Sequence, residues 1–262
     1  MGSVQMSCEK EIITEVNYST RVEPLISVIV PTYNEDQTVY ALLILVADEP
    51  TPKEILIVDD GSTDNTARQI DNWILSSGGV FRNVERVLWI RHEINQGKGF
   101  SIRSALEYVK GKYVIVQDAD MELSPHVYPK LIEPLEQGDA DFVIGMRITS
   151  VESNRFLYRI GIAILNIIVS LMYGYHLHDA ACCFKVMQRK HLLNMNLQCQ
   201  KFEFCPEVIA KASRMKLRIV EIPVPYTPRQ QLDGKKLKII SDGLSAIWTL
   251  LKYRFWREIP VS

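Results

Sequence analysis

Two aspartates separated by a single residue, Asp118 and Asp120, are the sharpest chemical feature of this sequence. They closely follow the apolar run Tyr113–Val116, which predicts a short buried strand. Carboxylates at this spacing can hold a hard divalent ion whose remaining positions take water and phosphate oxygens, and Glu122 could add a third ligand. Such an ion stabilises charge that develops on a diphosphate leaving group. The alternative is a turn in which Asp118 is a cap and Asp120 is solvated.

Polar clusters also follow other predicted strands. They are Pro31-Thr32-Tyr33-Asn34-Glu35, Asp59-Asp60-Gly61-Ser62, Asp118-Ala119-Asp120-Met121-Glu122 and Gly145-Met146-Arg147. Each cluster alone is compatible with a plain turn, because Asp, Gly and Ser dominate turns. In an open α/β sheet, however, ligands bind outside the carboxyl ends of the strands. Their joint occurrence therefore predicts one ligand site along this edge.

The elements that position these clusters alternate regularly through the first 150 residues. Continuous apolar runs predict strands at Leu25–Val30, Glu54–Val58, Val87–Ile90, Tyr113–Val116 and Phe142–Ile144. Helical patterns lie between them at Asp36–Ala47, Asp64–Leu75, Lys98–Val109 and Pro125–Leu135. Continuous apolar strands need cover on both faces. The alternation therefore predicts an α/β fold, with a Rossmann-like, mostly parallel central sheet flanked by helices.

The pattern changes after residue 150. We expect an apolar helix at Ile160–Tyr173, a loop near Tyr175–Phe184, a helix around Glu203–Ser213, a strand at Leu217–Val224 and an amphipathic helix at Ile239–Phe255. The 14 residues of the apolar stretch would span about 21 Å as a helix, short of a hydrocarbon core of roughly 30 Å. A membrane crossing is therefore not expected there.

Composition narrows the class of protein. The chain has 262 residues, 47% of them hydrophobic, and a formal net charge of −1. These values exclude a disordered chain and a generally basic nucleic-acid binder, so no nucleic-acid partner is expected. The charge is unevenly spread, since residues 211–262 hold 11 Lys and Arg against 4 Asp and Glu. A basic end on an acidic body predicts that the two parts face different partners.

The five cysteines do not form a recognisable framework. Their number is odd and no CxxC spacing occurs, which argues against a secreted disulfide scaffold and against a zinc site. Residues 1–23 are polar and lack a signal-peptide core. We expect reduced thiols and a cytoplasmic location.

The motifs resemble those of the family 2 glycosyltransferases with the GT-A fold. The matching segments are Pro31 to Glu35, Asp59 to Asp64, Asn95-Gln96-Gly97-Lys98-Gly99 and Asp118 to Asp120. Downstream segments are similar to the polyprenyl-phosphate branch, which includes dolichyl-phosphate mannose synthases. They are Gly145 to Arg147, Asp179 to Lys185, Phe202 to Phe204, Val220 to Val224, Arg229, and Gly234 to Lys236. The resemblance covers roughly Leu25 to Arg254.

The resemblance implies roles for individual residues. The nucleotide-sugar site would comprise Pro31, Tyr33, Glu35, Val58, Asp60, Asp118, Ala119 and Asp120. Asp118 and Asp120 would bind Mg²⁺ or Mn²⁺ on the diphosphate, with Asp120 catalytic and Glu122 a further possible ligand. Phosphate groups of the acceptor would be held by Arg147, Arg159, Arg229 and Lys236. Arginine suits this task because its planar fork holds phosphate oxygens in bidentate fashion.

Asp179 occupies the position where the family has an aspartate near the acceptor. With a hydroxyl acceptor it would be the general base, within hydrogen-bond reach of the attacking oxygen. A phosphate acceptor is already ionised at neutral pH and needs no strong base. In that case Asp179 would orient the acceptor or a sugar hydroxyl. The sequence leaves both roles open.

The two late helices could contact a membrane. The apolar helix is either a core element or an interfacial helix, and the last helix combines basic residues with Trp248, Phe255 and Trp256. Its alternative role is docking to a protein partner. We expect an N-terminal extension at 1–23, a GT-A domain at 24–230 and a basic amphipathic segment at 231–262. Attachment would be peripheral, at the cytoplasmic membrane face.

These observations favour an inverting, metal-dependent glycosyltransferase. Its donor would be a UDP- or GDP-linked sugar, and its acceptor a polyprenyl (dolichyl-type) phosphate. One alternative keeps the donor but uses a glycan or other hydroxyl acceptor with Asp179 as base. Another is a catalytically silent, membrane-associated binding module, against which the intact pair Asp118 and Asp120 argues.

Overall fold

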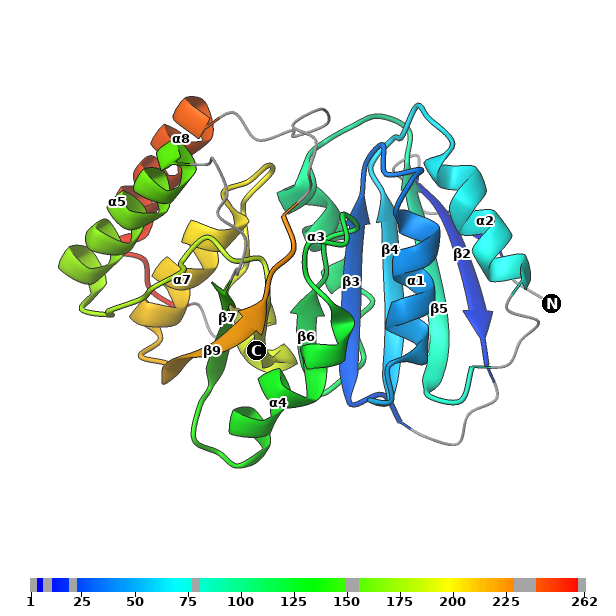
Figure 1. The fold of residues 1–262 in the computed structure, drawn as a ribbon, viewed down its shortest axis with the longest axis horizontal. Helices are drawn as coiled ribbons and strands as arrows, with labels where there is room; N and C mark the ends of the chain where they lie inside the picture. The colour runs from blue at the N-terminus through cyan, green and yellow to red at the C-terminus, as the bar shows by residue number, and fades with distance from the viewer. Residues whose placement is uncertain are drawn as a thin grey trace.

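The computed structural model describes residues 4–6, 11–18, 23–76, 81–148, 156–228 and 239–258. One nine-stranded sheet runs through them in the order β1-β2-β5-β4-β3-β6-β8-β7-β9 (Figure 1). Its strands are β1 (Val4–Met6), β2 (Glu11–Asn17), β3 (Ile26–Thr32), β4 (Lys53–Asp59), β5 (Val84–His92), β6 (Tyr113–Val116), β7 (Phe142–Ile148), β8 (Lys185–Gln188) and β9 (Ile219–Pro225).

Helices cover the sheet and extend beyond one end of it (Figure 1). They are α1 (Val39–Asp48), α2 (Thr66–Ser76), α3 (Lys98–Leu106), the short 3₁₀ helix η1 (Pro125–Val127), α4 (Tyr128–Glu136), α5 (Phe156–Tyr173), α6 (Arg189–Asn194), α7 (Phe204–Arg214) and α8 (Ile239–Tyr253). The α/β class expected from the alternating pattern is confirmed.

The centre of the sheet is the parallel block β5-β4-β3-β6. Every residue of β4 and β6 is buried, which explains why these strands read as continuous apolar runs. Thr32 at the end of β3 is in register with Asp59 at the end of β4. The polar clusters that follow these strands therefore emerge at one edge.

The outer strands make the sheet more mixed than the apolar runs predicted. β8 lies antiparallel between β6 and β7, and β2 is antiparallel to β5. β2 comes from the predicted N-terminal extension, so part of residues 1–23 continues the sheet. Within β2, the adjacent residues Ile12 and Ile13 face opposite sides of the sheet, and Ile12 is exposed whereas Ile13 is buried. This short alternation among polar residues is a weak sequence signal, which is why the strand was missed.

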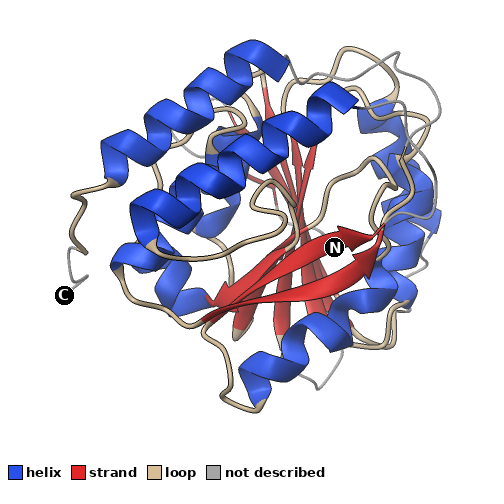
Figure 2. Cartoon of the chain, turned by 60° about the vertical axis from the view of Figure 1, so that its left-hand side comes forward, coloured by secondary structure: helices blue, strands red, loops and turns tan. Residues whose placement is uncertain are grey.

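Helices α5 and α8 lie side by side at the end of the molecule away from α2 (Figures 1 and 2). The Tyr173 hydroxyl of α5 donates to the Leu250 carbonyl of α8 at 2.6 Å. α5 begins at Phe156, before the predicted start, and has 18 residues. Within the described ranges, none of the helices combines the length and apolar character needed to cross a membrane.

Candidate active site

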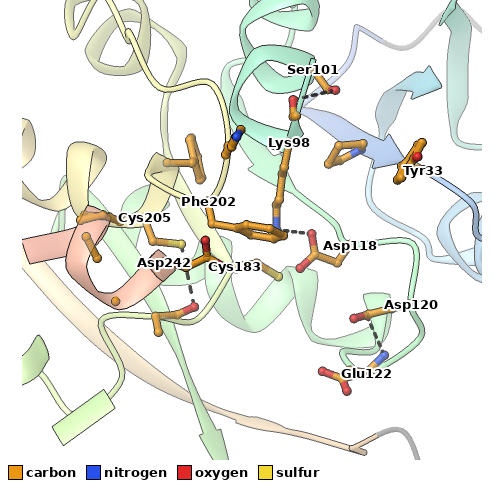
Figure 3. A pocket seen from close by; sticks show the side chains of 18 of the residues that line it. Tyr33, Lys98, Ser101, Asp118, Asp120, Glu122, Cys183, Phe202, Cys205 and Asp242 are labelled. Atoms are coloured by element: carbon orange, nitrogen blue, oxygen red, sulfur yellow. Dashed lines mark hydrogen bonds and ion pairs between the residues drawn. The ribbon is translucent and has the colours of Figure 1, made fainter. Parts of the chain in front are cut away.

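A cavity of about 670 Å³ lies at the carboxyl ends of β3, β4 and β6 and reaches the inner sides of α5 and α8. Figure 3 shows side chains from these separate elements converging on it. The predicted site residues that line it are Pro31, Tyr33, Glu35, Asp60, Asp118, Ala119, Asp120, Glu122 and Arg147. The parallel block thus brings together clusters that are far apart in the sequence, as the edge argument predicted.

Asp60 holds a loop in place at the cavity wall. Its Oδ1 accepts from the Gln96 backbone N–H at 3.0 Å and lies 2.7 Å from His92 Nδ1, while its Oδ2 accepts from the Gly97 N–H at 2.7 Å. Gly97 has φ 101°, a conformation that strongly favours glycine. The carboxylate is buried, so these bonds assign Asp60 to shaping the pocket around the Asn95–Gly97 loop.

Lys98, the first residue of α3, reaches across the cavity to Asp118 (Figure 3). Its ammonium forms an ion pair and hydrogen bond with Asp118 Oδ1. Burial acts to raise the pKa of Asp118, but the Lys98 charge outweighs it and the pKa of this carboxyl is lowered. The same pairing outweighs burial at Lys98 and raises its pKa. Both groups are therefore charged at neutral pH.

Asp120 and Glu122 form a tight turn after β6. The Glu122 N–H donates to Asp120 Oδ1 at 3.1 Å, and Met121 between them has φ 61°. The Glu122 carboxylate accepts from the Tyr226 hydroxyl at 2.8 Å. Within the part of the chain that the structure describes, no three His, Cys, Asp or Glu side chains are grouped to hold a metal ion. Asp118, Asp120 and Glu122 thus do not form a preassembled three-carboxylate site.

The remaining donors still suit a hard cation. Asp118 and Asp120 are half-buried and both line the cavity, and carboxylate oxygens are the ligands that Mg²⁺ and Mn²⁺ prefer. A cationic group, the Lys98 ammonium, already lies on Asp118, which shows that positive charge is accommodated there. Two protein carboxylates would leave positions for phosphate oxygens, the usual arrangement for Mg²⁺.

Arg147 and Asp179 are joined by a bidentate ion pair. Arg147 Nε lies 2.6 Å from Oδ2 and Nη2 lies 2.7 Å from Oδ1, and the Arg147 N–H also donates to Oδ2 at 3.1 Å. The guanidinium lies 5.4 Å from the centre of the Tyr226 ring. Arg147 lines the cavity, whereas Asp179 is only 5% exposed and is absent from its lining. This arrangement favours the orienting role of Asp179 over that of general base.

Glu221 of β9 fixes the loop that carries Asp179, a role that sequence reasoning missed. Its carboxylate accepts from the His178 N–H at 2.8 Å and from the Asp179 N–H at 2.8 Å. The side chain of Asn166, on α5, accepts from the next backbone N–H, that of Ala180, at 3.0 Å. The only available signal was the Val220 to Val224 motif in which Glu221 stands.

Four further predicted site residues remain, and only one of them has a side chain that the structure describes. Val58 is fully buried within β4 and does not line the cavity, because its side chain belongs to the core. Arg159 is on α5, but its side chain is outside the described structure. Arg229 and Lys236 also lie outside the described residues.

The cavity wall includes residues to which the sequence analysis gave no role. They are Lys98, Lys201, Phe202, Cys183, Cys205 and Asp242. Lys98 stood inside a quoted motif, so its position could have been noticed. Asp242 comes from α8, and no local pattern links that helix to the strand edge (Figure 3).

Helices α5 and α8 carry large exposed apolar side chains, and two of these, Ile164 and Leu244, also lie at the cavity rim. On α5 they are Ile160, Ile164, Ile167 and Leu171, and on α8 they are Leu244, Trp248 and Leu251, followed by Phe255. Lys252 and Arg257 are exposed beside them. Because the same two helices line the cavity, the apolar surface and the cavity share one boundary.

The sequence matches known proteins over most of its length. The family model "Glycosyl transferase family 2" matches residues 27–194. A dolichyl-phosphate beta-glucosyltransferase of Dictyostelium discoideum is 27% identical, covering 88% of this chain and 74% of its own length. A dodecaprenyl-phosphate galacturonate synthase of Rhizobium johnstonii is 26% identical, and the match covers 87% of this chain and 68% of that protein. A Methanococcus voltae UDP-N-acetylglucosamine–dolichyl-phosphate N-acetylglucosaminyltransferase is 27% identical, and the match covers 90% of this chain and 99% of that protein.

Solved structures share the fold. Glucosyl-3-phosphoglycerate synthase from Mycobacterium tuberculosis in complex with UDP is similar with a TM-score of 0.65 and 20% identity, covering 91% of this chain and 82% of that one. A complex of the same enzyme with Mn²⁺, UDP-glucose and phosphoglyceric acid also has a TM-score of 0.65. It is 19% identical, and the match covers 91% of this chain and 81% of that one. The GT-A architecture expected from the motifs is therefore confirmed.

Proposed function

Because this chain belongs to glycosyl transferase family 2, we propose that it moves a sugar from a nucleoside diphosphate donor to a polyprenyl phosphate, inverting the sugar's anomeric centre. The observation that carries this proposal is Arg147, which lies on the cavity wall with its fork oriented by Asp179. A guanidinium in this position suits an acceptor phosphate. Relatives from three organisms are named for transfer to lipid phosphates.

The donor would occupy the end of the cavity lined by Pro31, Tyr33 and Glu35. Asp118 and Asp120 would hold Mg²⁺ or Mn²⁺, which would neutralise charge on the departing diphosphate. Ala119, between them, leaves room for the sugar because its side chain is a single methyl group. We place a UDP-linked sugar first, since the Methanococcus voltae relative is named for one.

The acceptor would approach from the side of Arg147. A phosphate oxygen is ionised at neutral pH and attacks without a strong base, so one in-line displacement suffices. Asp179 would keep the Arg147 fork aligned, which lowers the entropy cost of positioning the acceptor. On the resemblance, Arg159, Arg229 and Lys236 would add phosphate contacts. Tyr226, beneath the guanidinium and bonded to Glu122, would link the acceptor side to the carboxylate turn.

We further propose that α5 and α8 rest on a membrane surface. Their exposed apolar side chains and the flanking Lys252 and Arg257 are suited to lipid tails and anionic headgroups respectively. In this position the cavity would open toward lipid-linked acceptors. The basic segment 231–262 and α5 would then be the membrane-facing parts of the chain, and the rest of residues 24–230 with β2 the catalytic body.

A donor and acceptor screen tests the proposal. Nucleoside diphosphate release is followed with UDP- and GDP-linked sugars, Mn²⁺ or Mg²⁺, and a short-chain polyprenyl phosphate. The matched polyprenol, which lacks the phosphate, is the control. We expect release only with the phosphate, and a product of inverted anomeric configuration by NMR. Equal release with the polyprenol would instead identify a hydroxyl acceptor.

A further inference from the structure

The positively charged side chain of Lys98 occupies Asp118, one of the two proposed metal ligands. Its ammonium lies on Asp118 Oδ1, and the two side chains are only 19% and 27% exposed. Such partial shielding strengthens the attraction compared with a fully solvated ion pair. Figure 3 shows the Lys98 side chain extending from α3 across the cavity to this carboxylate.

The backbone that carries Lys98 is firmly anchored. The Gly99 N–H donates to the Lys201 carbonyl at 2.9 Å, and the Phe100 N–H donates to the Gln200 carbonyl at 2.9 Å. A β-carbon on Gly97 would come within 2.5 Å of the Gln200 carbonyl oxygen, so this contact is close. Any movement of the ammonium must therefore come from the side-chain torsions of Lys98, with the start of α3 held still.

A divalent ion and an ammonium cannot both contact Asp118 without strong mutual repulsion. At a separation of about 4 Å, a charge of +2 and a charge of +1 repel by several kcal/mol at the effective dielectric constant of a protein surface. The ion must therefore displace Lys98. A nucleoside diphosphate entering the cavity offers the released ammonium new anionic oxygens.

We propose that Lys98 is an internal counter-ion that competes with the divalent metal for Asp118, so that metal and nucleoside diphosphate bind together rather than metal alone. This inference rests on the proposed function, because it takes Asp118 as a metal ligand. In the donor-free protein, Lys98 keeps the affinity for metal low. Once diphosphate is present, Lys98 transfers to it and Asp118 becomes available.

The experiment measures Mn²⁺ binding directly, from the loss of the free-Mn²⁺ EPR signal, with and without UDP. The variants are Lys98→Gln, Lys98→Met and Lys98→Arg, with folding checked by circular dichroism. Lys201→Gln is the matched control, because it removes a charge from the same cavity without an ion pair to Asp118.

Without UDP, Lys98→Gln and Lys98→Met should bind Mn²⁺ at least about tenfold more tightly than the unaltered protein. Lys98→Arg and Lys201→Gln should remain close to it. UDP should enhance Mn²⁺ binding strongly in the unaltered protein and much less in the two neutral Lys98 variants.

Unchanged or weaker Mn²⁺ binding by both neutral Lys98 variants would overturn the inference, while Mn²⁺ binding by the unaltered protein with UDP would leave the proposed metal site standing. Failure of every variant to bind Mn²⁺, even with UDP, would overturn both the inference and the metal assignment. Sugar transfer measured separately in the screen would then show whether the proposed reaction proceeds without metal.

Discussion

Arg147 and Asp179 meet in a bidentate ion pair, although they lie on different segments of the chain, at the end of β7 and in the loop before β8. The buried carboxylate occupies two of the guanidinium's donor groups and its backbone N–H. A base must reach the attacking oxygen, whereas a positioning residue must only hold its partner. The pair is what an orienting residue requires, and the two roles of Asp179 differ in the kinetics that they predict.

Asp179→Asn removes the negative charge and one of the two oxygens that accept from the Arg147 guanidinium. We expect kcat/KM for polyprenyl phosphate to fall about tenfold to a hundredfold, mainly through a higher KM, because Arg147 loses its orientation. The pH profile of kcat should keep its shape, since no proton is taken by Asp179. Steady-state kinetics between pH 6 and 9 provides the measurement.

The contrary outcome is specific. If Asp179→Asn abolishes kcat and also removes an acidic limb from the pH profile, Asp179 acts as a base. Glu221→Gln is a useful companion, because it loosens the Asp179 loop at the His178 and Asp179 backbone N–H groups and at the His178 ring, while Arg147 and Asp179 themselves are unchanged. It should show a weaker version of the Asp179→Asn effect.

Asp120→Ala tests the carboxylate pair. With one of two proposed protein ligands removed, metal-dependent donor binding should weaken by at least about a hundredfold and transfer should be lost. Calorimetry with UDP and Mn²⁺ measures the binding. Glu122→Gln is the control, since Glu122 is bonded to Tyr226, and it should retain most donor affinity. Unchanged diphosphate release by Asp120→Ala would contradict the metal assignment.

The double substitution Trp248→Ser and Phe255→Ser tests the membrane surface. These side chains are 67% and 84% exposed on and just after α8, so their loss should not disturb the core. We expect partitioning to anionic vesicles to fall at least about tenfold, because two apolar insertions are removed. Co-flotation with vesicles at low salt measures it, and added salt should weaken the binding further.

Leu75→Ser supplies the matched control for the membrane experiment. Leu75 is 78% exposed on α2, at the opposite end of the molecule from α8 (Figure 1). It should bind vesicles like the unaltered protein. An equal loss in both variants would show that apolar exposure in general, rather than the α5 and α8 surface, governs vesicle binding.

Glu54→Ala tests the internal ion pair that supports the parallel block. Glu54 is fully buried and accepts from Ser27 Oγ at 2.5 Å and Arg86 Nε at 2.7 Å. Its removal leaves Arg86 buried with only part of its bonds, which should lower the free energy of unfolding by about 3 kcal/mol. Glu15→Ala, which removes the more exposed partner of Arg86, should cost about 1 kcal/mol or less. Urea denaturation of both variants checks this, and equal losses would contradict it.

Local patterns were sufficient for the central strands and for the sheet edge that forms the cavity wall. β3, β4 and β6 read as apolar runs because each is covered on both faces, and the residues that follow them meet because parallel strands end together. Asp118, Asp120 and Arg147 could therefore be assigned to one edge from the sequence alone. β2 was missed because its few apolar residues stand among polar ones, and β8 was missed because its four residues are too few to show a period.

The amino-acid order thus determined the class of fold, the family and many of the residues at the cavity edge of the sheet, because these depend on short-range periodicity and motif spacing. The pairing of the charged side chains in the site was decided only by the tertiary structure. The pairs Lys98–Asp118 and Arg147–Asp179 join residues 20 and 32 positions apart. Such pairings arise from the packing of whole elements, as does the position of α5 and α8 beside the cavity. No local pattern encodes them, because they require the complete sheet and its surrounding helices.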